Sequence, residues 1–310
     1  MHCTMVSARC FFFRSVVIVS ALVFMFFVWL RKPVHLSKTT SLPPGFDCRF
    51  YTPSVPHHSQ NGHLSDLNAE LLKQLGPPNR TVAKDTVAII IPYRNRYLEL
   101  FNFLLRMHVF LRKQTVQYVM LVVEQSGSEF FNRAKLFNAA VREIRGSSLG
   151  DPLREIDCFI LHDVDKVPIS NSTIYNCGPA VRQMVTSFKT ESEFVPLYAH
   201  FLGAVTAFRW EHLEAINGAS NVFYGWGGED DDIYRRLQLK RISIDRASKD
   251  EGIFFEFNRN HSRKLLADRA KLIQFDSVQW RMQNDGLAQT SYRLVKKKHY
   301  DHFVWMLFDL

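Results

Sequence analysis

Three uninterrupted apolar runs in the middle of the chain restrict the folds that it can adopt. They are "TVAIII", which begins at Thr86, "YVMLVVEQ", which begins at Tyr118, and "DCFILHDVD", which begins at Asp157. Continuous runs of β-branched and aliphatic residues are typical of strands that are buried on both faces of a parallel sheet. The segments between the runs have the apolar spacing of helices. The order strand, helix, strand therefore predicts βαβ units and an α/β fold.

The segments between these runs show the period of amphipathic helices. Helical spacing relates Leu98, Phe101, Leu104, Leu105 and Val109 in the first, and Leu136, Phe137, Ala140, Val141 and Ile144 in the second. A shorter helix is expected from Leu64 to Leu75, inside a stretch that is otherwise rich in proline and polar residues. Ligands of such sheets bind beyond the carboxyl ends of the strands, so the acids of "HDVD" stand where a ligand would lie.

An apolar stretch near the N-terminus, Ser15 to Leu30, approaches the length of a membrane-spanning helix. Basic residues flank it on both sides, and no small-residue cleavage site follows it. An uncleaved signal anchor is therefore favoured over a cleaved signal peptide. We expect a cytoplasmic tail at 1–14, a transmembrane signal anchor at 15–32, a stem or linker at 33–84 and a luminal domain at 85–310.

The composition fits one sizeable domain with extra segments, or two small domains, because 46% of the 310 residues are hydrophobic and 22% are charged. The formal net charge of +9 favours anionic partners such as phosphates, nucleotides or acidic glycans. A solvated basic face is the commoner cause of such a balance, and scattered lysines such as Lys296, Lys297 and Lys298 fit it.

Three cysteines follow the expected anchor: Cys48, Cys158 and Cys177. A luminal compartment permits disulfides, and only Cys158 and Cys177 are close in sequence. Glycosylation sequons begin at Asn79, Asn171 and Asn260, which also fits a secretory route.

Four carboxylates in a row, Glu229 to Asp232, directly follow three glycines and a tryptophan in "GWGGEDDD". The run is the solvated start of a helix, a cation site, or the acid/base group of an enzyme. A helix explains Asp231 and Asp232, because acids in the first turn complement the helix dipole and can pair with Arg235 and Arg236 four residues further on. A helix alone does not explain the glycines, which let a ligand approach the backbone closely.

Two further groups are candidate ligands. Asp163 and Asp165 project from the same side of an extended strand end, and such oxygen atoms suit Mg²⁺ or Mn²⁺ that bridges to phosphates. An isolated Asp-x-Asp is more often a surface feature, but its place after a buried strand favours the site. In "NRNHSRK", His261 could supply a nitrogen ligand and Arg263 could contact a phosphate, although a lone histidine is usually structural.

Together these motifs resemble the β-1,4-galactosyltransferase family. "VAIIIPYRNR", "FNRAK", "DVDKVPISN", "INGASNVFYGWGGEDDDIYRRL", "HSR" and "NDGL" occur in the order found in that family, from Thr86 to the C-terminus. The resemblance implies a type II Golgi membrane enzyme whose luminal catalytic domain has a GT-A-like nucleotide-sugar-binding sheet with flanking helices. It also implies a UDP-sugar donor, a glycan acceptor, Mn²⁺ and no nucleic-acid partner. Cys158 and Cys177 fall where the family has a disulfide.

The resemblance assigns roles to individual residues. The donor would be bound by Pro92, Tyr93, Arg94, Asn95, Arg96, Phe131, Asn132, Arg133, Val164, Asp165, Trp226, His261, Ser262 and Arg263. Gly227, Gly228, Glu229 and Asp230 would face the acceptor. The metal ligands would be Asp165 and His261, with Asn258 at the position of a third.

The family's chemistry is a single displacement that converts an α-linked UDP-sugar into a β-linked product. It requires one base for the acceptor hydroxyl and one electrophile for the leaving diphosphate. The resemblance implies Asp230 as the base, with Glu229 beside it. A carboxylate among other carboxylates, partly desolvated when the Trp226 loop closes, is expected to have a raised pKa.

Several positions depart from the family pattern. Asn258 stands where well-known members have a methionine ligand, and its carboxamide oxygen is a harder donor than a thioether. Phe201 replaces a donor-selecting tyrosine, which leaves galactose and N-acetylgalactosamine both open. Gln274 replaces an arginine on the acceptor side, and Cys48 lacks its family partner. "HDVD" and "IYRR" also resemble the branch that adds galactose to xylose, although that branch has arginine in place of Gly228.

We therefore expect an inverting glycosyltransferase that moves galactose from UDP-galactose in β-1,4 linkage to terminal N-acetylglucosamine of glycoproteins or glycolipids. The first alternative keeps the reaction and changes the donor to UDP-N-acetylgalactosamine, because of Phe201. The second is a membrane-anchored, non-catalytic protein that binds sugar or nucleotide, because of Asn258 and Gln274.

Overall fold

The computed structural model describes residues 63–78, 86–191, 193–257 and 269–310, all within one unit, Gly45–Leu310. The expected cytoplasmic tail, signal anchor and most of the stem lie outside the described residues. Within the described ranges, no helix is long and apolar enough to cross a membrane.

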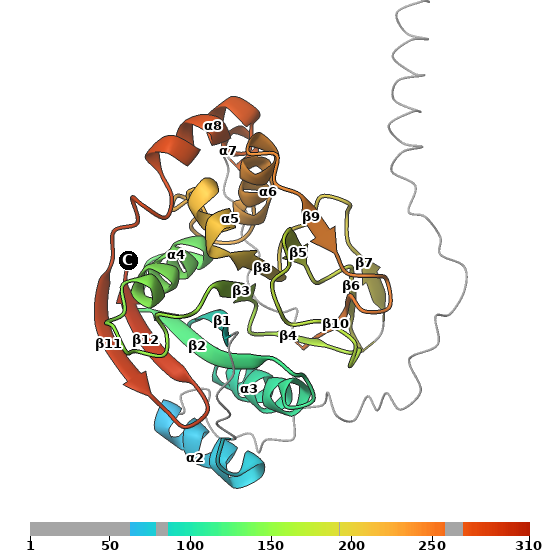
Figure 1. Cartoon of the computed structure of the whole chain (residues 1–310), viewed down its shortest axis with the longest axis vertical. Coiled ribbons are helices and arrows are strands. Elements are labelled where there is room, and N and C mark those ends of the chain that lie inside the picture. Colours follow the sequence, from blue (N-terminus) through green and yellow to red (C-terminus); the bar gives the residue numbers. More distant parts are fainter. Residues whose placement is uncertain (1–62, 79–85, 192, 258–268) are drawn as a thin grey trace, which may run out of the picture. The chain divides into compact units, whose positions relative to one another are not determined.

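The central sheet has eight strands in the order β11-β12-β2-β1-β3-β8-β5-β9 (Figure 1). They are β1 (Thr86–Tyr93), β2 (Gln117–Gln125), β3 (Cys158–His162), β5 (Val181–Gln183), β8 (Val205–Arg209), β9 (Ile244–Arg246), β11 (Arg293–His299) and β12 (Val304–Asp309). The three apolar runs form the parallel neighbours β2, β1 and β3. The α/β class is confirmed, and antiparallel pairing of β11 with β12 and of β3 with β8 makes the sheet mixed.

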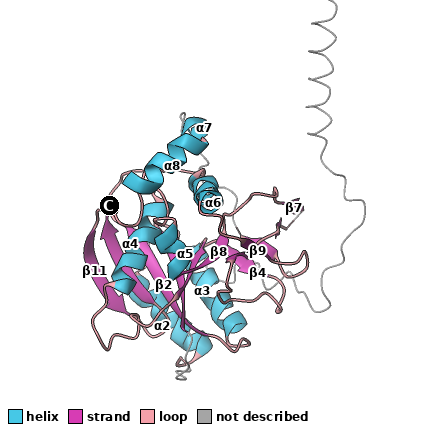
Figure 2. Cartoon of the chain, turned by 45° about the horizontal axis from the view of Figure 1, so that its top comes forward, coloured by secondary structure: helices cyan, strands magenta, loops and turns pink. Residues whose placement is uncertain are grey.

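Different helices cover the two faces of this sheet, which Figure 2 shows as magenta strands between cyan helices. The helices are α2 (Leu64–Leu75), α3 (Tyr97–Leu111), α4 (Arg133–Arg145), α5 (Trp210–Ala215) and α6 (Glu229–Leu239). In β1, Val87, Ile89 and Ile91 pack with α2 and α3, whereas Ala88 and Ile90 pack with α4, α5 and α6. Because successive side chains of a strand point to opposite faces, an apolar run without alternation is what this three-layer arrangement requires.

The predicted helices are present, and the spacing in α3 holds for the buried Phe101 and Leu104 but not for Val109. The helix expected from Leu64 to Leu75 is α2, and the second amphipathic segment is α4. In α3, Val109 is 47% exposed, and the buried face is formed by residues such as Phe103, Met107 and Phe110. Nearly every position of α3 is apolar, so the spacing alone does not determine which face turns inward.

A second, four-stranded sheet has the order β4-β10-β6-β7. Its strands are β4 (Lys166–Pro168), β6 (Ser187–Lys189), β7 (Phe194–Pro196) and β10 (Ile253–Glu256). Because β4 begins shortly after β3 ends, this sheet borders the Asp-Val-Asp turn. Two more helices, α7 (Arg269–Leu272) and α8 (Phe275–Asn284), gather with α6 at one end of the unit (Figure 1).

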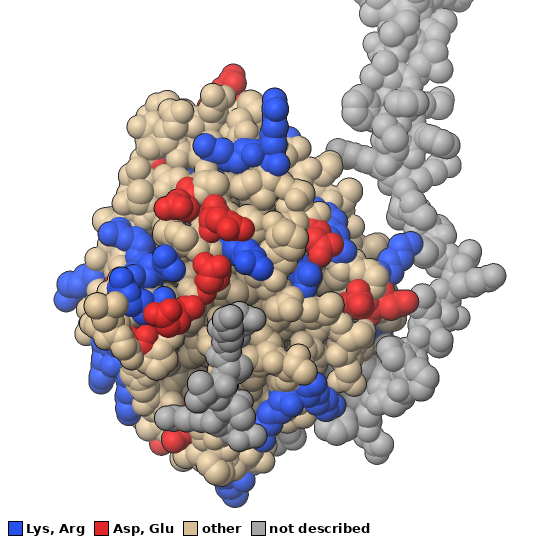
Figure 3. All heavy atoms as spheres, viewed as in Figure 1, with Lys and Arg blue, Asp and Glu red and all other residues tan. Residues whose placement is uncertain are grey.

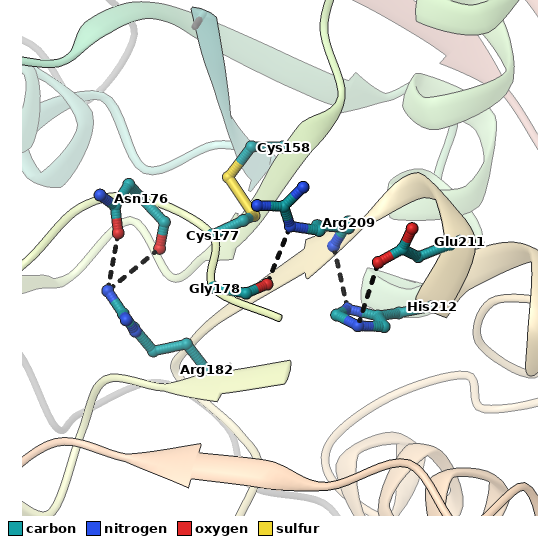
Figure 4. The surroundings of a disulfide bond; sticks show 8 residues. All are labelled: Cys158, Asn176, Cys177, Gly178, Arg182, Arg209, Glu211 and His212. Carbon is teal, nitrogen blue, oxygen red and sulfur yellow. Dashed lines mark hydrogen bonds and ion pairs between the residues drawn. A yellow bond between two sulfur atoms is a disulfide. The ribbon is translucent and has the colours of Figure 1, made fainter. Parts of the chain in front are cut away.

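A disulfide joins Cys158, the first residue of β3, to Cys177 (Figure 4). The pairing that the resemblance implied is therefore confirmed. The neighbouring carbonyl of Gly178 accepts a 2.9 Å hydrogen bond from Nε of Arg209, which lies opposite Cys158 on β8. The disulfide thus ties the segment after β4 to the start of β3, the strand that precedes the acidic turn.

The connections around β1 define the place of a ligand. β1 lies between β2 and β3; α3 follows β1 and packs on one face, and α4 follows β2 and packs on the other. The crevice beyond the carboxyl ends of β1 and β3 is therefore a topological switch point, where open α/β sheets bind their ligands.

Candidate active site

The turn after β3 holds two acidic residues, and both are paired with cations. Asp165 is 2% exposed; its Oδ2 lies 3.0 Å from Nη2 of Arg96, and its Oδ1 lies 2.6 Å from Nζ of Lys166. Asp163 accepts a hydrogen bond from Nε of Arg133 at 2.7 Å. The structure therefore brings the predicted Arg96 and Asp165 together across the ends of β1 and β3.

The first turn of α4 links the two acidic motifs. Asn132 caps the helix, because its side chain accepts the backbone N–H of Lys135 at 2.9 Å. Arg133 follows the cap; it bonds Asp163, and its Nη1 lies 3.6 Å from Oε1 of Glu229. Burial acts to lower the pKa of Arg133, but the two carboxylates raise it. One guanidinium therefore joins the Asp-Val-Asp turn to the start of α6.

The segment after β1 lies beside the segment before α4. Pro92 and Tyr93 end β1 and are buried, and burial together with neighbouring charge raises the pKa of Tyr93. The guanidinium of Arg94 lies 5.5 Å from the ring centroid of Phe131, at cation–π distance. Asn95 has a φ of 53°, a left-handed conformation that asparagine tolerates. "PYRNR" and "FNR" thus lie side by side beyond the end of β1.

The acidic run begins α6 behind two glycines in left-handed conformations. Gly227 has a φ of 80° and Gly228 a φ of 87°. Burial and the charge of Asp230 raise the pKa of Glu229 to about 7, and its buried Oε2 has no hydrogen-bond partner among the described residues. Burial and the charge of Asp231 likewise raise the pKa of Asp230. The expected raised pKa in this run is therefore present, and it is most pronounced at Glu229.

Phe201 lies against the same carboxylates. A β carbon at Gly203 would come within 2.8 Å of both Oδ2 of Asp230 and Cζ of Phe201, so the three residues converge on one point. Arg246 holds the backbone by donating to the carbonyl of Phe201 at 2.7 Å, and the ring of Tyr198 packs edge-on against Phe201 at 5.4 Å. The proposed donor selector thus borders the proposed base.

The expected solvated pair at the end of the run is a buried network. Arg236 donates from Nε to Oδ2 of Asp232 at 2.6 Å, as the spacing predicts, but both side chains are fully buried. The other oxygen of Asp232 is bound by Arg281 from α8. The expectation of solvent exposure is wrong, because α8 covers this side of α6.

The expected pairing of Asp231 with Arg235 is also wrong. Asp231 accepts a hydrogen bond from the hydroxyl of Tyr198 at 3.1 Å, and Arg235 donates to Gln238 at 2.9 Å. Tyr198 takes the place of Arg235 as the partner of Asp231 because packing of its ring against Phe201 holds its hydroxyl close to that carboxylate.

The side chain of Arg269 lies across the two glycines before α6, and no sequence motif predicted it there. A β carbon would lie 2.7 Å from Nη1 of Arg269 at Gly227 and 2.9 Å from its Cδ at Gly228. Within the part of the chain that the structure describes, the buried guanidinium nitrogens of Arg269 have no hydrogen-bond partner, and burial lowers its pKa. Trp226, beside them, is 42% exposed. No motif marks Arg269, so only its position in the fold points to the site.

Lys166 and Glu256 were also missed. Both are buried, and Nζ of Lys166 lies 3.3 Å from Oε1 of Glu256. Burial acts to lower the pKa of Lys166, but its three acidic neighbours raise it. The sequence did contain a signal for Lys166, because it directly follows Asp-Val-Asp at the end of a buried strand. A lysine buried at such a place is almost always paired with an acid.

Part of the predicted site lies outside the described residues, namely Asn258, His261, Ser262 and Arg263. Val164 is buried between the two aspartates. In the described part of the chain, no group of three or more His, Cys, Asp or Glu side chains is arranged to hold a metal ion. On the coloured part of the face in Figure 3, acidic and basic groups are interspersed.

Two family models match the chain. The N-terminal region of glycosyl transferase group 7 matches residues 55–178, and the N-terminal domain of galactosyltransferase matches residues 185–262. Mouse β-1,4-galactosyltransferase 4 is 32% identical over 294 residues, which cover 88% of this chain and 82% of that protein. Human β-1,4-galactosyltransferase 4 is 35% identical over 265 residues (82% and 74%), and human β-1,4-galactosyltransferase 6 is 34% identical over 273 residues (82% and 69%).

Solved structures share the fold. The catalytic domain of Drosophila β-1,4-galactosyltransferase 7 in complex with xylobiose has a TM-score of 0.61 and 22% identity, covering 73% of this chain and 94% of that one. A mutant of the same fly enzyme, in complex with manganese, UDP-Gal and xylobiose, matches equally well. With the relatives above, the motifs in their order and the convergence of Arg133, Asp163 and Glu229, the chain belongs to the β-1,4-galactosyltransferase family of glycosyltransferases.

Proposed function

We propose that the protein transfers galactose from UDP-galactose, with inversion, in β-1,4 linkage to terminal N-acetylglucosamine of glycoproteins or glycolipids. The bridge made by Arg133 between Asp163 and Glu229 is the observation that carries the proposal. It unites the donor-side and acceptor-side motifs in one crevice at the switch point of the sheet. The galactosyltransferase names of the relatives and the UDP-Gal in the fly complex support the choice of donor.

In the proposed mechanism, Asp230 takes the proton of the acceptor hydroxyl as that oxygen bonds to the anomeric carbon, the bond from that carbon to the diphosphate breaks and UDP leaves. The raised pKa of Asp230 makes it a stronger base than an exposed aspartate. Arg96 and Arg133, fixed by Asp165 and Asp163, offer positive charge to the diphosphate. Gly227 and Gly228 leave room at the backbone for the acceptor once the side chain of Arg269 moves aside, and half-exposed Trp226 covers the donor and excludes water.

Mn²⁺ fits the donor set at the acidic turn. Asp165 offers buried carboxylate oxygens beyond the end of β3, which suit a hard divalent cation. We propose Asp165 and His261 as ligands, with the carboxamide of Asn258 as a third. The ion would supply electrophilic stabilisation of the leaving diphosphate.

Replacing the proposed base tests the mechanism. The purified full-length Asp230→Asn variant should lose turnover by about a hundredfold to ten-thousandfold, the usual contribution of a general base. UDP affinity, measured by calorimetry, should change by less than about threefold, because Asp230 does not hold the nucleotide. Asp245→Asn is the matched control, since Asp245 lies on the edge strand β9 and pairs only at the surface with Arg182. Turnover by Asp230→Asn close to that of wild type would remove Asp230 from the base role.

A second donor is kept because of Phe201. Its ring and the carboxylate of Asp230 both lie beside Gly203. A substituent of a donor sugar bound near Asp230 would therefore contact Phe201. Phenylalanine lacks the hydroxyl that helps to exclude an N-acetyl group, which favours use of UDP-N-acetylgalactosamine as well. Relative turnover of the two donors by wild type and by Phe201→Tyr decides the point. An unchanged ratio would show that Phe201 does not select the donor.

We also propose a single-pass type II Golgi membrane protein with its catalytic domain in the lumen, anchored by residues 15–32. The apolar stretch supports the anchor, and the Cys158–Cys177 disulfide supports an oxidising compartment. Protease digestion of sealed Golgi vesicles should spare a C-terminal epitope tag and remove an N-terminal one. Loss of the C-terminal tag in sealed vesicles would contradict the topology.

A further inference from the structure

Lys166 is a buried cation inside the site, and none of the roles proposed so far involves it. Its Nζ lies 2.6 Å from Oδ1 of Asp165, 3.5 Å from Oδ2 of Asp163 and 3.3 Å from Oε1 of Glu256. The ammonium also lies 5.2 Å from the ring centroid of Phe188. These contacts enclose it in a group of carboxylates beside an aromatic face.

Both oxygens of Asp165 already face a positive charge. Lys166 approaches Oδ1, and Arg96 approaches Oδ2 at 3.0 Å. A divalent cation that binds Asp165 uses the same lone pairs, and like charges a few ångströms apart repel strongly where water is excluded. An ion that binds Oδ1 of Asp165 therefore requires the ammonium of Lys166 to move away, whereas Arg96 can stay at Oδ2.

Glu256 provides the place to which the ammonium can move. It lies on β10 directly opposite Lys166 on β4 in the antiparallel pair, so the backbones of the two strands hold the two side chains together. Glu256 is 5% exposed, and its carboxylate already lies close to Nζ. Leaving Asp165 for Glu256 therefore requires only a small movement and does not leave the ammonium unpaired.

We propose that Lys166 is a built-in counter-ion that competes with the divalent cation for Asp165 and transfers to Glu256 when the ion binds. The inference rests on the proposed role of Asp165 as a metal ligand. Lys166 keeps the acidic turn folded and partly neutralised without metal, and it weakens metal binding. Glu256 offsets part of that loss by accepting the displaced ammonium. The two residues thus act on metal affinity in opposite directions.

Direct titration of Mn²⁺ tests this opposition without measuring turnover. Free Mn²⁺ is followed by electron paramagnetic resonance in full-length wild type and variants. Lys166→Met should bind Mn²⁺ at least about tenfold more tightly, the factor that corresponds to 1.4 kcal/mol. Glu256→Gln should bind it several-fold more weakly, because the displaced ammonium loses its second anion. Lys166→Arg, which keeps the charge, should stay within a few-fold of wild type.

Lys189→Met is the matched control. Lys189 lies on β6 of the same small sheet, with its ammonium 5.0 Å from the ring centroid of Phe194, and should leave Mn²⁺ affinity unchanged. If Lys166→Met does not fold, the double variant Lys166→Met/Glu256→Met removes both charges of the pair and should also bind more tightly than wild type. A purely structural role for Lys166 predicts weaker binding in every variant that perturbs the cluster, and that result overturns the proposal.

Adding Asp165→Asn to Lys166→Met identifies the ligand. The gain in affinity should disappear; a gain that persists would place the ion elsewhere and overturn the proposal. Failure of the proposed galactose transfer is a separate result, because it is seen as missing turnover with UDP-galactose while the Mn²⁺ titrations keep their opposite signs.

Discussion

The two ends of the acidic run in the first turn of α6, Glu229 and Asp232, have the same kind of side chain but opposite environments. At the C-terminal end, Asp232 is fully buried, and Arg236 and Arg281 each bind one of its oxygens. At the N-terminal end, Glu229 is also buried, but Arg133 approaches Oε1, and Oε2 has no hydrogen-bond partner in the described ranges. The same kind of charge is therefore fully paired at one end and half paired at the other.

The difference shows what burial does to a carboxylate. A buried charge is tolerated when hydrogen-bonded cations replace the lost water, and it shifts its pKa when they do not. The paired Asp232 connects α6 to α8, whereas the pKa of Glu229 rises to about 7. Groups with strongly perturbed pKa values collect at functional sites. The run thus divides into a structural half and a half whose carboxylates have raised pKa values, where we propose that the acceptor binds.

Breaking the paired end should produce the largest loss of stability. Asp232→Ala leaves Arg236 and Arg281 buried without their carboxylate, which should cost about 3–5 kcal/mol of unfolding free energy. Urea unfolding of the full-length protein at pH 7 measures the loss. Asp231→Ala is the control on the same helix turn and should cost less than about 1 kcal/mol, because its partner is one tyrosine hydroxyl. Equal losses in the two variants would contradict the comparison.

Neutralising Glu229 at the half-paired end should raise the unfolding free energy instead of lowering it. The native carboxyl of Glu229 keeps its proton to a higher pH than in the unfolded chain, whose ordinary pKa is 4.5. The native state therefore binds more protons between these pKa values, and stability falls as pH rises from about 4.5 to 7. Glu229→Gln removes that loss and should raise the unfolding free energy at pH 8 by about 3 kcal/mol.

At pH 5 the gain from Glu229→Gln should be under about 1 kcal/mol, because the native carboxyl is then protonated. Turnover should fall in the same variant, as expected where stability is given up for function. A gain of the same size at pH 5 and pH 8 would show that the pKa of Glu229 is not the cause.

Replacing Gly228, which precedes the half-paired end, should cause an intermediate loss of unfolding free energy. Gly228→Ala places a β carbon in a left-handed conformation and 2.9 Å from Cδ of Arg269. Strain of this kind should cost about 1–3 kcal/mol. Adding Arg269→Ala should recover the part that comes from the collision and leave the backbone part. Urea unfolding of the two single variants and the double variant gives both parts; full recovery would show that the φ of Gly228 adds no strain.

The central sheet was predictable because β1, β2 and β3 are buried on both faces, and that environment requires long apolar runs. The small sheet was not, because β4, β6 and β7 have three residues each and carry no period. In α3 the spacing identified the buried Phe101 and Leu104 but also included the exposed Val109, because apolar residues on several sides of the helix do not select one inward face.

The candidate site was predictable as a set of motifs but not as a network. The motifs placed Arg133, Asp165 and Glu229 in one family site, and Asp163 was predicted only from its place at a strand end. The bonds among them depend on how α4, β3 and α6 meet in space. Burial of Asp232 depends on Arg281, which is 49 residues away in sequence. Such long-range pairings leave no local pattern, and this is also why Arg269 was missed.

The smallest effect should come from the hydrogen bond of Asp231, because its donor is a tyrosine hydroxyl and not a cation. Tyr198, which is 53% exposed, donates to Asp231 at 3.1 Å, and burial with the charges of Asp230 and Asp231 raises the pKa of its phenol. Tyr198→Phe removes the hydroxyl and keeps the ring on Phe201. Water can solvate the freed carboxylate, so unfolding free energy at pH 7 should fall by less than about 1 kcal/mol. A loss near that of Asp232→Ala would mean that Asp231 belongs to the structural half, and the division of the run would then fall between Asp230 and Asp231.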